Sequence, residues 1–152
     1  MKKYLILFTV FLTTFSSCEK DDICVEENTP RLIISFYDND DHEQIKQLTK
    51  TYIWAVGKDS LSNYSNESLD SIAVPLNLSE NVTKYVIENN TIKDTIEFNY
   101  SRKDTFISRS CGYITIFENL VIENNTILWI KDTEILNATI ENETFAHINI
   151  YH

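Results

Sequence analysis

The chain contains very little glycine and proline, with two of each in 152 residues. Asparagine, by contrast, occurs 15 times. Asn tolerates a left-handed backbone better than most residues do. We therefore expect the turns of this protein to be built mostly from Asn, Asp and Ser.

The spacings that mark common catalytic and cofactor sites are also missing from the sequence. There is no nucleotide-binding loop and no C-x-x-C pair. The three histidines, His42, His147 and His152, stand outside any zinc-type spacing or nucleophile elbow. Carboxylates are abundant, but nothing singles out a pair for glycoside hydrolysis. The sequence predicts a protein that is not an enzyme and that binds no cofactor.

One short loop gathers side chains that could bind calcium. Asp38, Asp40, Asp41 and His42 lie within five residues of one another. The loop lacks the glycine turn and the distal bidentate Glu of known calcium loops. We predict an ordinary solvated turn and no metal site, with a calcium loop as the alternative.

Positive charge is scarce. Lys and Arg together number 13 against 23 Asp and Glu, so the net charge is -10. Removal of Lys2 and Lys3 with a leader would leave 11 basic residues and a net charge of -12. Such a surface repels phosphate backbones and anionic lipid headgroups, so we expect no nucleic-acid partner.

The N-terminal residues have the features of a signal peptide. Lys2 and Lys3 precede an apolar run over residues 4–15, and Ser16 and Ser17 follow it. A run of about 12 residues is too short to span a bilayer core near 30 Å thick. Residues 1–17 are therefore predicted to be a leader that is removed.

Cys18 follows the leader directly. The sequence FSSC resembles a lipobox, the pattern used in bacterial lipoprotein processing, and it accounts for an odd third cysteine. We predict that Cys18 is lipidated and that residues 18–23 form a tether to the outer membrane. The alternative is an ordinary secreted protein with an unmodified cysteine.

An acidic segment follows the predicted anchor. Lys20, Asp21 and Asp22 resemble the export tag that sends lipoproteins of the Bacteroidota to the outer face of the outer membrane. The predicted location is therefore the cell surface. The alternative is a solvated acidic tether with the domain facing the periplasm.

Cys24 and Cys111 are the two remaining cysteines. In an oxidising compartment a disulfide between them is the default, with two free buried thiols as the alternative. Only five residues separate Cys18 from Cys24, and an extended chain covers at most about 3.6 Å per residue. Cys24 is thus expected within about 20 Å of the lipid surface, where an integral barrel protein could be a partner.

Short runs rich in β-branched and aromatic residues alternate with polar breaks from Arg31 onward, which is typical of strands. TIEFNY, DTFIS and TILWI are three of these runs, and the polar stretch over residues 38–50 is predicted to be a loop. Ile92, Ile96, Phe98 and Tyr100 lie on one side of a two-residue alternation. About eight to ten strands without alternating helices predict an all-β antiparallel two-sheet sandwich of the immunoglobulin-like or Greek-key type over residues 24–152. A small β-barrel is the alternative.

The string VIENNTI occurs twice, at residues 86–92 and 121–127. Its flanks differ and there is no third copy, so we do not interpret it as a repeat unit. Asn is the best substitute for Gly where both central turn residues need positive φ. We therefore predict tight hairpin turns at Asn89–Asn90 and at Asn124–Asn125.

Several segments resemble a family of small uncharacterised Bacteroidota lipoproteins, grouped only as a domain of unknown function. The segments are TPRLIISFYDNDD after the cysteine, DSIAVPLN, TIEFNYSRKDTFISRSCGYITIFENL and ATIENETFAHINIYH. The resemblance implies the localisation, the β fold and the pairing of Cys24 with Cys111. It implies no known activity.

Two functions rest on the features named above, and a third, a hydrolase, would need a solvent-lined pocket that holds paired carboxylates or a histidine. The first is a non-enzymatic interaction module, an accessory subunit of an outer-membrane barrel protein or a surface complex. The second is a surface glycan-binding protein in which Tyr52 and Trp54, which share a strand face, stack on sugars. Core packing of these two aromatics is the alternative to sugar stacking.

Overall fold

The structure is a computed structural model that describes Cys24 and residues 28–152. Within these residues, no helix combines the length and the apolar character needed to cross a bilayer. A single 3-10 turn covers Ser62–Tyr64. The strands are β1 (Leu32–Tyr37), β2 (Leu48–Ala55), β3 (Glu67–Leu69), β4 (Ser71–Val74), β5 (Val82–Asn89), β6 (Ile92–Ser108), β7 (Gly112–Asn125), β8 (Asp132–Ile135) and β9 (Ile148–Tyr151).

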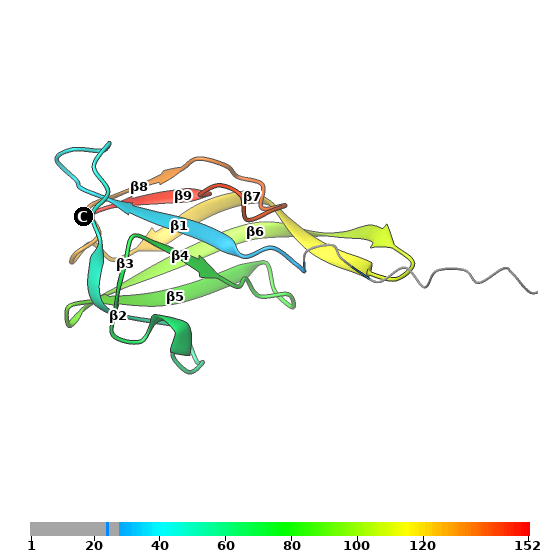
Figure 1. Cartoon of the computed structure of the whole chain (residues 1–152), viewed down its shortest axis with the longest axis horizontal. Helices are drawn as coiled ribbons and strands as arrows, with labels where there is room; N and C mark the ends of the chain where they lie inside the picture. The colour runs from blue at the N-terminus through cyan, green and yellow to red at the C-terminus, as the bar shows by residue number, and fades with distance from the viewer. Residues whose placement is uncertain (1–23, 25–27) are drawn as a thin grey trace, which may run out of the picture.

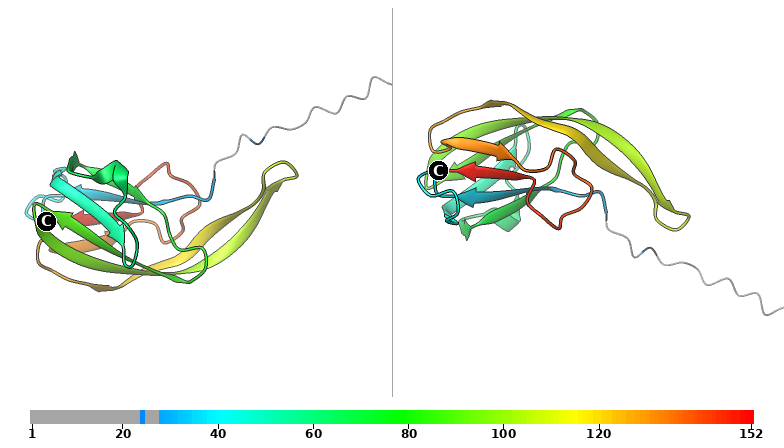
Figure 2. Two further views of the ribbon diagram at one scale, coloured as in Figure 1. Left: turned by 90° about the horizontal axis from the view of Figure 1, so that it is seen from below. Right: turned by 90° about the horizontal axis from the view of Figure 1, so that it is seen from above.

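The strands form two sheets that pack face to face (Figures 1 and 2). The four-stranded sheet has the order β4-β1-β9-β8 and the five-stranded sheet has the order β3-β2-β5-β6-β7. The chain changes sheet after β1, β3, β4 and β7. The predicted β-sandwich is confirmed, and the barrel alternative is wrong because the two sheets do not close on each other.

The core lies between the sheets and follows the two-residue alternation of the strands. Leu32, Ile34 and Phe36 of β1 are fully buried, and so are Ile96 and Phe98 of β6. Alternate residues of β6 are less buried. Ile92 is an exception to the predicted apolar face, since it lies at the strand end and is largely exposed.

One strand pair departs from the predicted antiparallel arrangement. β1 and β9 run parallel, with Ile34 opposite Ile148 and Phe36 opposite Ile150. The other pairings in the described residues are antiparallel. A parallel pair needs a crossover connection, and here the rest of the domain separates the two strands in sequence.

The two copies of VIENNTI adopt different structures. Asn89 pairs with Ile92, so the first turn is centred on Asn90 and Thr91, both at positive φ, one residue later than predicted. The predicted turn at Asn124–Asn125 is wrong. Asn124 and Asn125 end β7 and pair with Glu97 and Ile96 of β6. A long-range strand partner decides the conformation of the second copy.

Two other segments differ from the predicted strand pattern. TIEFNY and DTFIS, expected as separate strands, are parts of the single 17-residue strand β6. Residues 126–130, expected as a strand, belong to no strand. The stretch over residues 38–50, expected as a loop, has no helix, but its last three residues belong to β2, which begins at Leu48.

Candidate functional site

The most prominent feature of the molecule is a two-stranded arm. β5 pairs with β6 only up to the contact of Val82 with Asn99. β6 and β7 continue together from the pair Ser101 and Glu118 to the pair Ser108 and Gly112. We call residues 101–118 the arm. The arm projects beyond the sandwich, away from the C-terminus (Figures 1 and 2).

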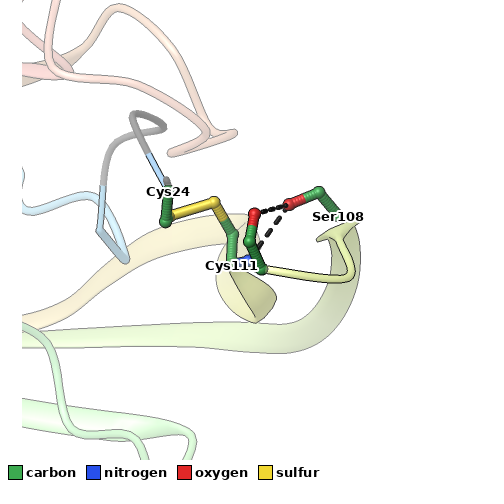
Figure 3. Close-up of a disulfide and its surroundings, with 4 residues drawn as sticks. Cys24, Ser108 and Cys111 are labelled. Carbon is green, nitrogen blue, oxygen red and sulfur yellow. Dashed lines mark hydrogen bonds between the residues drawn. A yellow bond between two sulfur atoms is a disulfide. The ribbon is translucent and has the colours of Figure 1, made fainter. Parts of the chain in front are cut away.

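A disulfide ties the turn of the arm to the N-terminal part of the chain. Cys24 and Cys111 are bonded, with their Cα atoms 5.0 Å apart. The Oγ atom of Ser108 accepts a hydrogen bond of 3.0 Å from the amide of Cys111 (Figure 3). The predicted pairing is confirmed in the structure, and the alternative of two free thiols does not hold.

The end of the arm exposes an aromatic pair. Phe106 is 55% exposed and Tyr113 is 71% exposed. Their rings are in edge-to-face contact, with centroids 5.3 Å apart. We call residues 105–115 the tip of the arm. The tip includes Arg109 and contains no acidic side chain. The tip is thus apolar and weakly basic on a strongly acidic protein.

A second set of aromatic side chains lies on the outer face of the five-stranded sheet. Thr51 and Ile53 of β2 are buried, so Tyr52 and Trp54 point away from the core. Tyr52 is 37% exposed. The Nζ atom of Lys93 lies 5.4 Å from the centroid of the Trp54 ring. The predicted shared face is confirmed, and the alternative of core packing is wrong for these two residues.

Asp94 is the most heavily hydrogen-bonded carboxylate of the described residues, and the sequence analysis missed it. It is fully buried. It accepts hydrogen bonds from the Thr126 hydroxyl and from the amides of Leu128, Trp129 and Ile130. The amide bonds measure 2.9, 2.7 and 2.8 Å. Asp94 therefore holds the segment that leads from β7 to β8.

The signal for Asp94 was present in the sequence. It occupies the apolar side of the alternation, between Ile92 and Ile96, and a buried carboxylate needs hydrogen-bond donors. Burial raises the pKa of Asp94, but the hydrogen bonds from Thr126, Ile130, Leu128 and Trp129 outweigh burial and hold the pKa below its usual value. Asp94 is thus an ionised structural anchor.

A comparison with known protein families matches residues 50–152 to the family of unknown function DUF6452. The chain belongs to this family. No curated protein and no solved structure matches the chain. The DUF6452 match includes Tyr52, Trp54, Asp94 and the whole arm, but it begins after Cys24. The disulfide therefore joins the matched DUF6452 region to a residue that precedes it.

The three histidines of this DUF6452 chain are engaged in packing. The Nδ1 atom of His147 accepts a hydrogen bond of 3.1 Å from the amide of Ile33. Burial lowers the pKa of His147 below its usual value. His42 stacks on Tyr151, with ring centroids 3.8 Å apart, and the Nε2 atom of His152 lies 3.0 Å from the carbonyl oxygen of Lys46.

The acidic loop after β1 is held by hydrogen bonds within the protein. The Oδ1 atom of Asp38 accepts hydrogen bonds from the amides of Asp40 and Asp41. Its Oδ2 atom lies 2.8 Å from the Nζ atom of Lys46. The hydrogen bond from Lys46 lowers the pKa of Asp38. Over the described part of the chain, no three or more His, Cys, Asp or Glu side chains form a metal-binding group.

Two of the arginines stabilise loops at the end of the sandwich that carries the arm. The guanidinium of Arg31 donates two hydrogen bonds to Glu143, at 2.9 and 2.6 Å, and lowers the pKa of that carboxyl. The Nε atom of Arg102 donates to the Oδ1 atom of Asn81 at 2.7 Å. Arg109 is exposed in the turn of the arm.

A groove of about 710 Å³ lies between the end of β2, the start of β5 and the loop before β5. Its wall includes Val56, Leu78 and Lys84. Tyr52 and Trp54 do not line this groove. The aromatic face predicted from the sequence and this groove are therefore separate surfaces.

The signals for anchoring and export lie outside the described residues. These are the leader over residues 1–17, the lipidation site Cys18 and the export tag Lys20, Asp21 and Asp22. Cys24 is the described residue nearest to them in sequence. The tether and its lipid therefore stay predictions from the sequence.

Proposed function

We propose that this protein is a lipid-anchored, non-enzymatic interaction module at the outer membrane, an accessory subunit of an integral barrel protein or of a surface complex. The observation that carries the proposal is the disulfide between Cys24 and Cys111. It joins the arm to a residue only six positions after Cys18. A lipid on Cys18 would thus hold one defined end of the sandwich at the membrane.

The geometry of the tether limits how far the arm can lie from the lipid. Six residue steps of at most about 3.6 Å span about 20 Å. The two bridged Cα atoms are 5.0 Å apart. The turn of the arm would therefore stay within about 25 Å of the anchor. Partners that lie in the same membrane are within reach of the domain.

The outer face of the five-stranded sheet is the surface best suited to a neighbouring protein. Tyr52 and Trp54 are partly exposed there beside two charged side chains, Lys93 and Glu88. Tyr and Trp are enriched among the residues that dominate binding energy at protein interfaces. With the arm directed at the membrane, this face would be directed sideways, toward membrane neighbours.

Site-specific photo-crosslinking in intact cells tests this proposal. A photo-reactive residue replaces Tyr52, and a matched control replaces Asp40 in the loop after β1. We expect the Tyr52 position, and not the Asp40 position, to give one discrete product with an integral outer-membrane protein. Absence of any product at position 52, together with extraction of the protein as a clean monomer in mild detergent, would contradict the proposal.

The outward orientation of Tyr52 and Trp54 also favours a second candidate function, glycan binding. Two aromatic rings on one strand face, flanked by charged groups that can hydrogen-bond to hydroxyls, form a platform on which sugar rings can stack. The fluorescence of Trp54 should then change on titration with oligosaccharides, and the change should be absent in Trp54→Phe. A spectrum that does not respond to a broad glycan panel would remove this candidate.

A further inference from the structure

The arm end of the molecule collects exposed aromatic side chains. Tyr52, Phe106, Tyr113 and Phe145 are the aromatic residues among the exposed large hydrophobics of the described chain. Phe106 and Tyr113 lie on the arm. Phe145, 78% exposed, lies in the loop between β8 and β9. That loop is joined to the start of β1 by the ion pair of Glu143 with Arg31, so three of the four lie at this end.

The aromatic tip is held in place by contacts at its base and at its turn. An isolated two-stranded hairpin is marginally stable in water. Here the disulfide fixes Cys111 to Cys24, and the amide of Thr115 donates a hydrogen bond of 3.1 Å to the hydroxyl of Thr29. The hydroxyl of Thr115 also donates to Asp104 at 2.8 Å. The disulfide and these hydrogen bonds thus stabilise the hairpin that carries Phe106 and Tyr113.

The charge of the tip differs from the charge of the molecule. The whole chain has a net charge of -10, whereas residues 105–115 carry Arg109 and no acidic residue. The acidic remainder of the protein is repelled by anionic headgroups. The tip is a part of the surface at which this repulsion is absent and at which a basic side chain can approach a phosphate.

We propose that the tip of the arm inserts into the lipid headgroup region of the membrane that holds the anchor, with Phe106 and Tyr113 as the inserted side chains. This inference rests on the proposed function, because the lipid on Cys18 brings the tip to the bilayer. Aromatic rings are favoured at the membrane interface, and a Tyr places its hydroxyl among the headgroups.

The size of the tip favours a lipid surface over a protein partner. A stable protein interface buries at least about 1,200 Å² in total. An aromatic side chain contributes only about 150 to 250 Å². Two aromatics on a narrow hairpin are too small for a protein interface of that kind, but they suffice to orient a domain that a lipid already anchors.

Quenching by brominated lipid tests the proposal. The full lipidated chain, with Trp54→Phe to remove the partly exposed indole, is reconstituted into vesicles of phosphatidylethanolamine and phosphatidylglycerol with brominated acyl chains. Tyr113→Trp introduces the reporter at the tip. Ile45→Trp introduces a matched reporter in an exposed loop at the opposite end of the sandwich. The buried Trp129 is common to both variants.

We expect quenching of the tip reporter to be several-fold stronger than quenching of the Ile45→Trp reporter. Adding Phe106→Ser should weaken the quenching at the tip. Equal, weak quenching at both positions on a protein with a fatty acid at Cys18 would overturn the insertion of the arm and leave the anchor intact. The proposal would also be overturned if a protein partner crosslinks to the tip and lipid does not quench the tip reporter.

Mass spectrometry of the intact protein checks separately whether Cys18 carries a fatty acid. A chain with no lipid at Cys18 contradicts the proposed function. The tip can then still be measured by adding the soluble protein to the same vesicles. In that format, each aromatic replaced by Ser should lower vesicle affinity by a factor of about ten, from the burial energy of one aromatic side chain. Unchanged affinity would overturn the role of the aromatics.

Discussion

A single carboxylate organises the passage between the two sheets. Asp94 accepts four hydrogen bonds from residues 126–130, three of them from backbone amides. These amides have no strand partner, because the segment lies between β7 and β8. A buried amide that loses its acceptor costs about 1 to 3 kcal/mol. Asp94 thus provides the acceptors that a strand partner would otherwise provide for these three amides.

Asp94→Asn should therefore lower the free energy of unfolding by about 3 kcal/mol. The Nδ2 group of Asn is a donor and would face donors. Asp104→Asn on the same strand is the matched control, since Asp104 is exposed, and it should cost less than about 1 kcal/mol. Urea denaturation of the two variants measures both effects. Equal losses would contradict the role given to Asp94.

Folding should depend on pH through His147. Burial lowers its pKa in the folded state, so the fold favours the neutral ring, whose Nδ1 atom accepts from Ile33. The unfolded chain binds a proton near pH 6.5. The contribution of His147 is therefore present above that pH and is lost as pH falls from about 6.5 toward the folded pKa.

His147→Gln should reduce this loss. The measurement is the urea midpoint of the wild type and of the variant at pH 7.5, 6.5 and 5.5. The difference between the two proteins isolates His147, because the carboxylates and the other histidines are common to both. A difference that is constant over this range would show that His147 does not titrate between the folded and unfolded states.

At the scale of the element, the arm depends on its covalent link. The bridge of Cys24 with Cys111 spans 87 residues of sequence. The chain-entropy relation gives about 4 to 5 kcal/mol for a loop of this size. The double variant Cys24→Ser, Cys111→Ser should lose about that much free energy of unfolding.

Hydrogen exchange should show where the loss of the bridge acts. Amides of residues 101–118 should exchange faster in the double variant. Amides of β5, which pairs with both β2 and β6, should exchange faster only to the extent that the loss of global stability requires. Faster exchange in β5 without a change in the arm would contradict the view that the bridge braces the hairpin.

Strand positions were predictable from the sequence where alternation and burial agree. β1, with Leu32, Ile34 and Phe36 facing inward, is an example. The shared face of Tyr52 and Trp54 follows from the same period, but its outward direction does not, because alternation alone does not say which face meets the core. The heptapeptide VIENNTI shows the limit. Its first copy ends in a turn and its second ends in strand pairing with β6, because the partner strand lies far away in sequence.

The candidate site was predictable to a similar degree. The disulfide followed from counting cysteines, but the arm did not, because residues 101–103 are polar and indicate a break between strands. They pair with β7 nonetheless. The place of Asp94 on the apolar side of the alternation hints at its burial, but three of its four donors are backbone amides, and these have no side-chain signature in the sequence. Spatial partners of this kind are beyond the reach of local patterns.

At the scale of the whole molecule, the proposed attachment to the membrane should be separable from folding. Cys18→Ser should leave the sandwich folded, because the residues of the core cluster lie between Leu32 and Ile150. It should move the protein from the membrane fraction to the soluble fraction of cells. Fractionation with labelled palmitate checks this outcome. A variant that stays in the membrane fraction would contradict lipid anchoring at Cys18.

The parallel pairing of β1 with β9 also bears on how the chain assembles. The β5–β6–β7 meander involves near neighbours in sequence and can form as soon as residue 125 is available. The four-stranded sheet cannot, because β1 lies between β4 and β9. Contacts between distant residues slow folding. One edge of β1 can pair with β4 early, but its other edge stays open until β9 is made, so the second layer cannot close over the first before residue 151 is available.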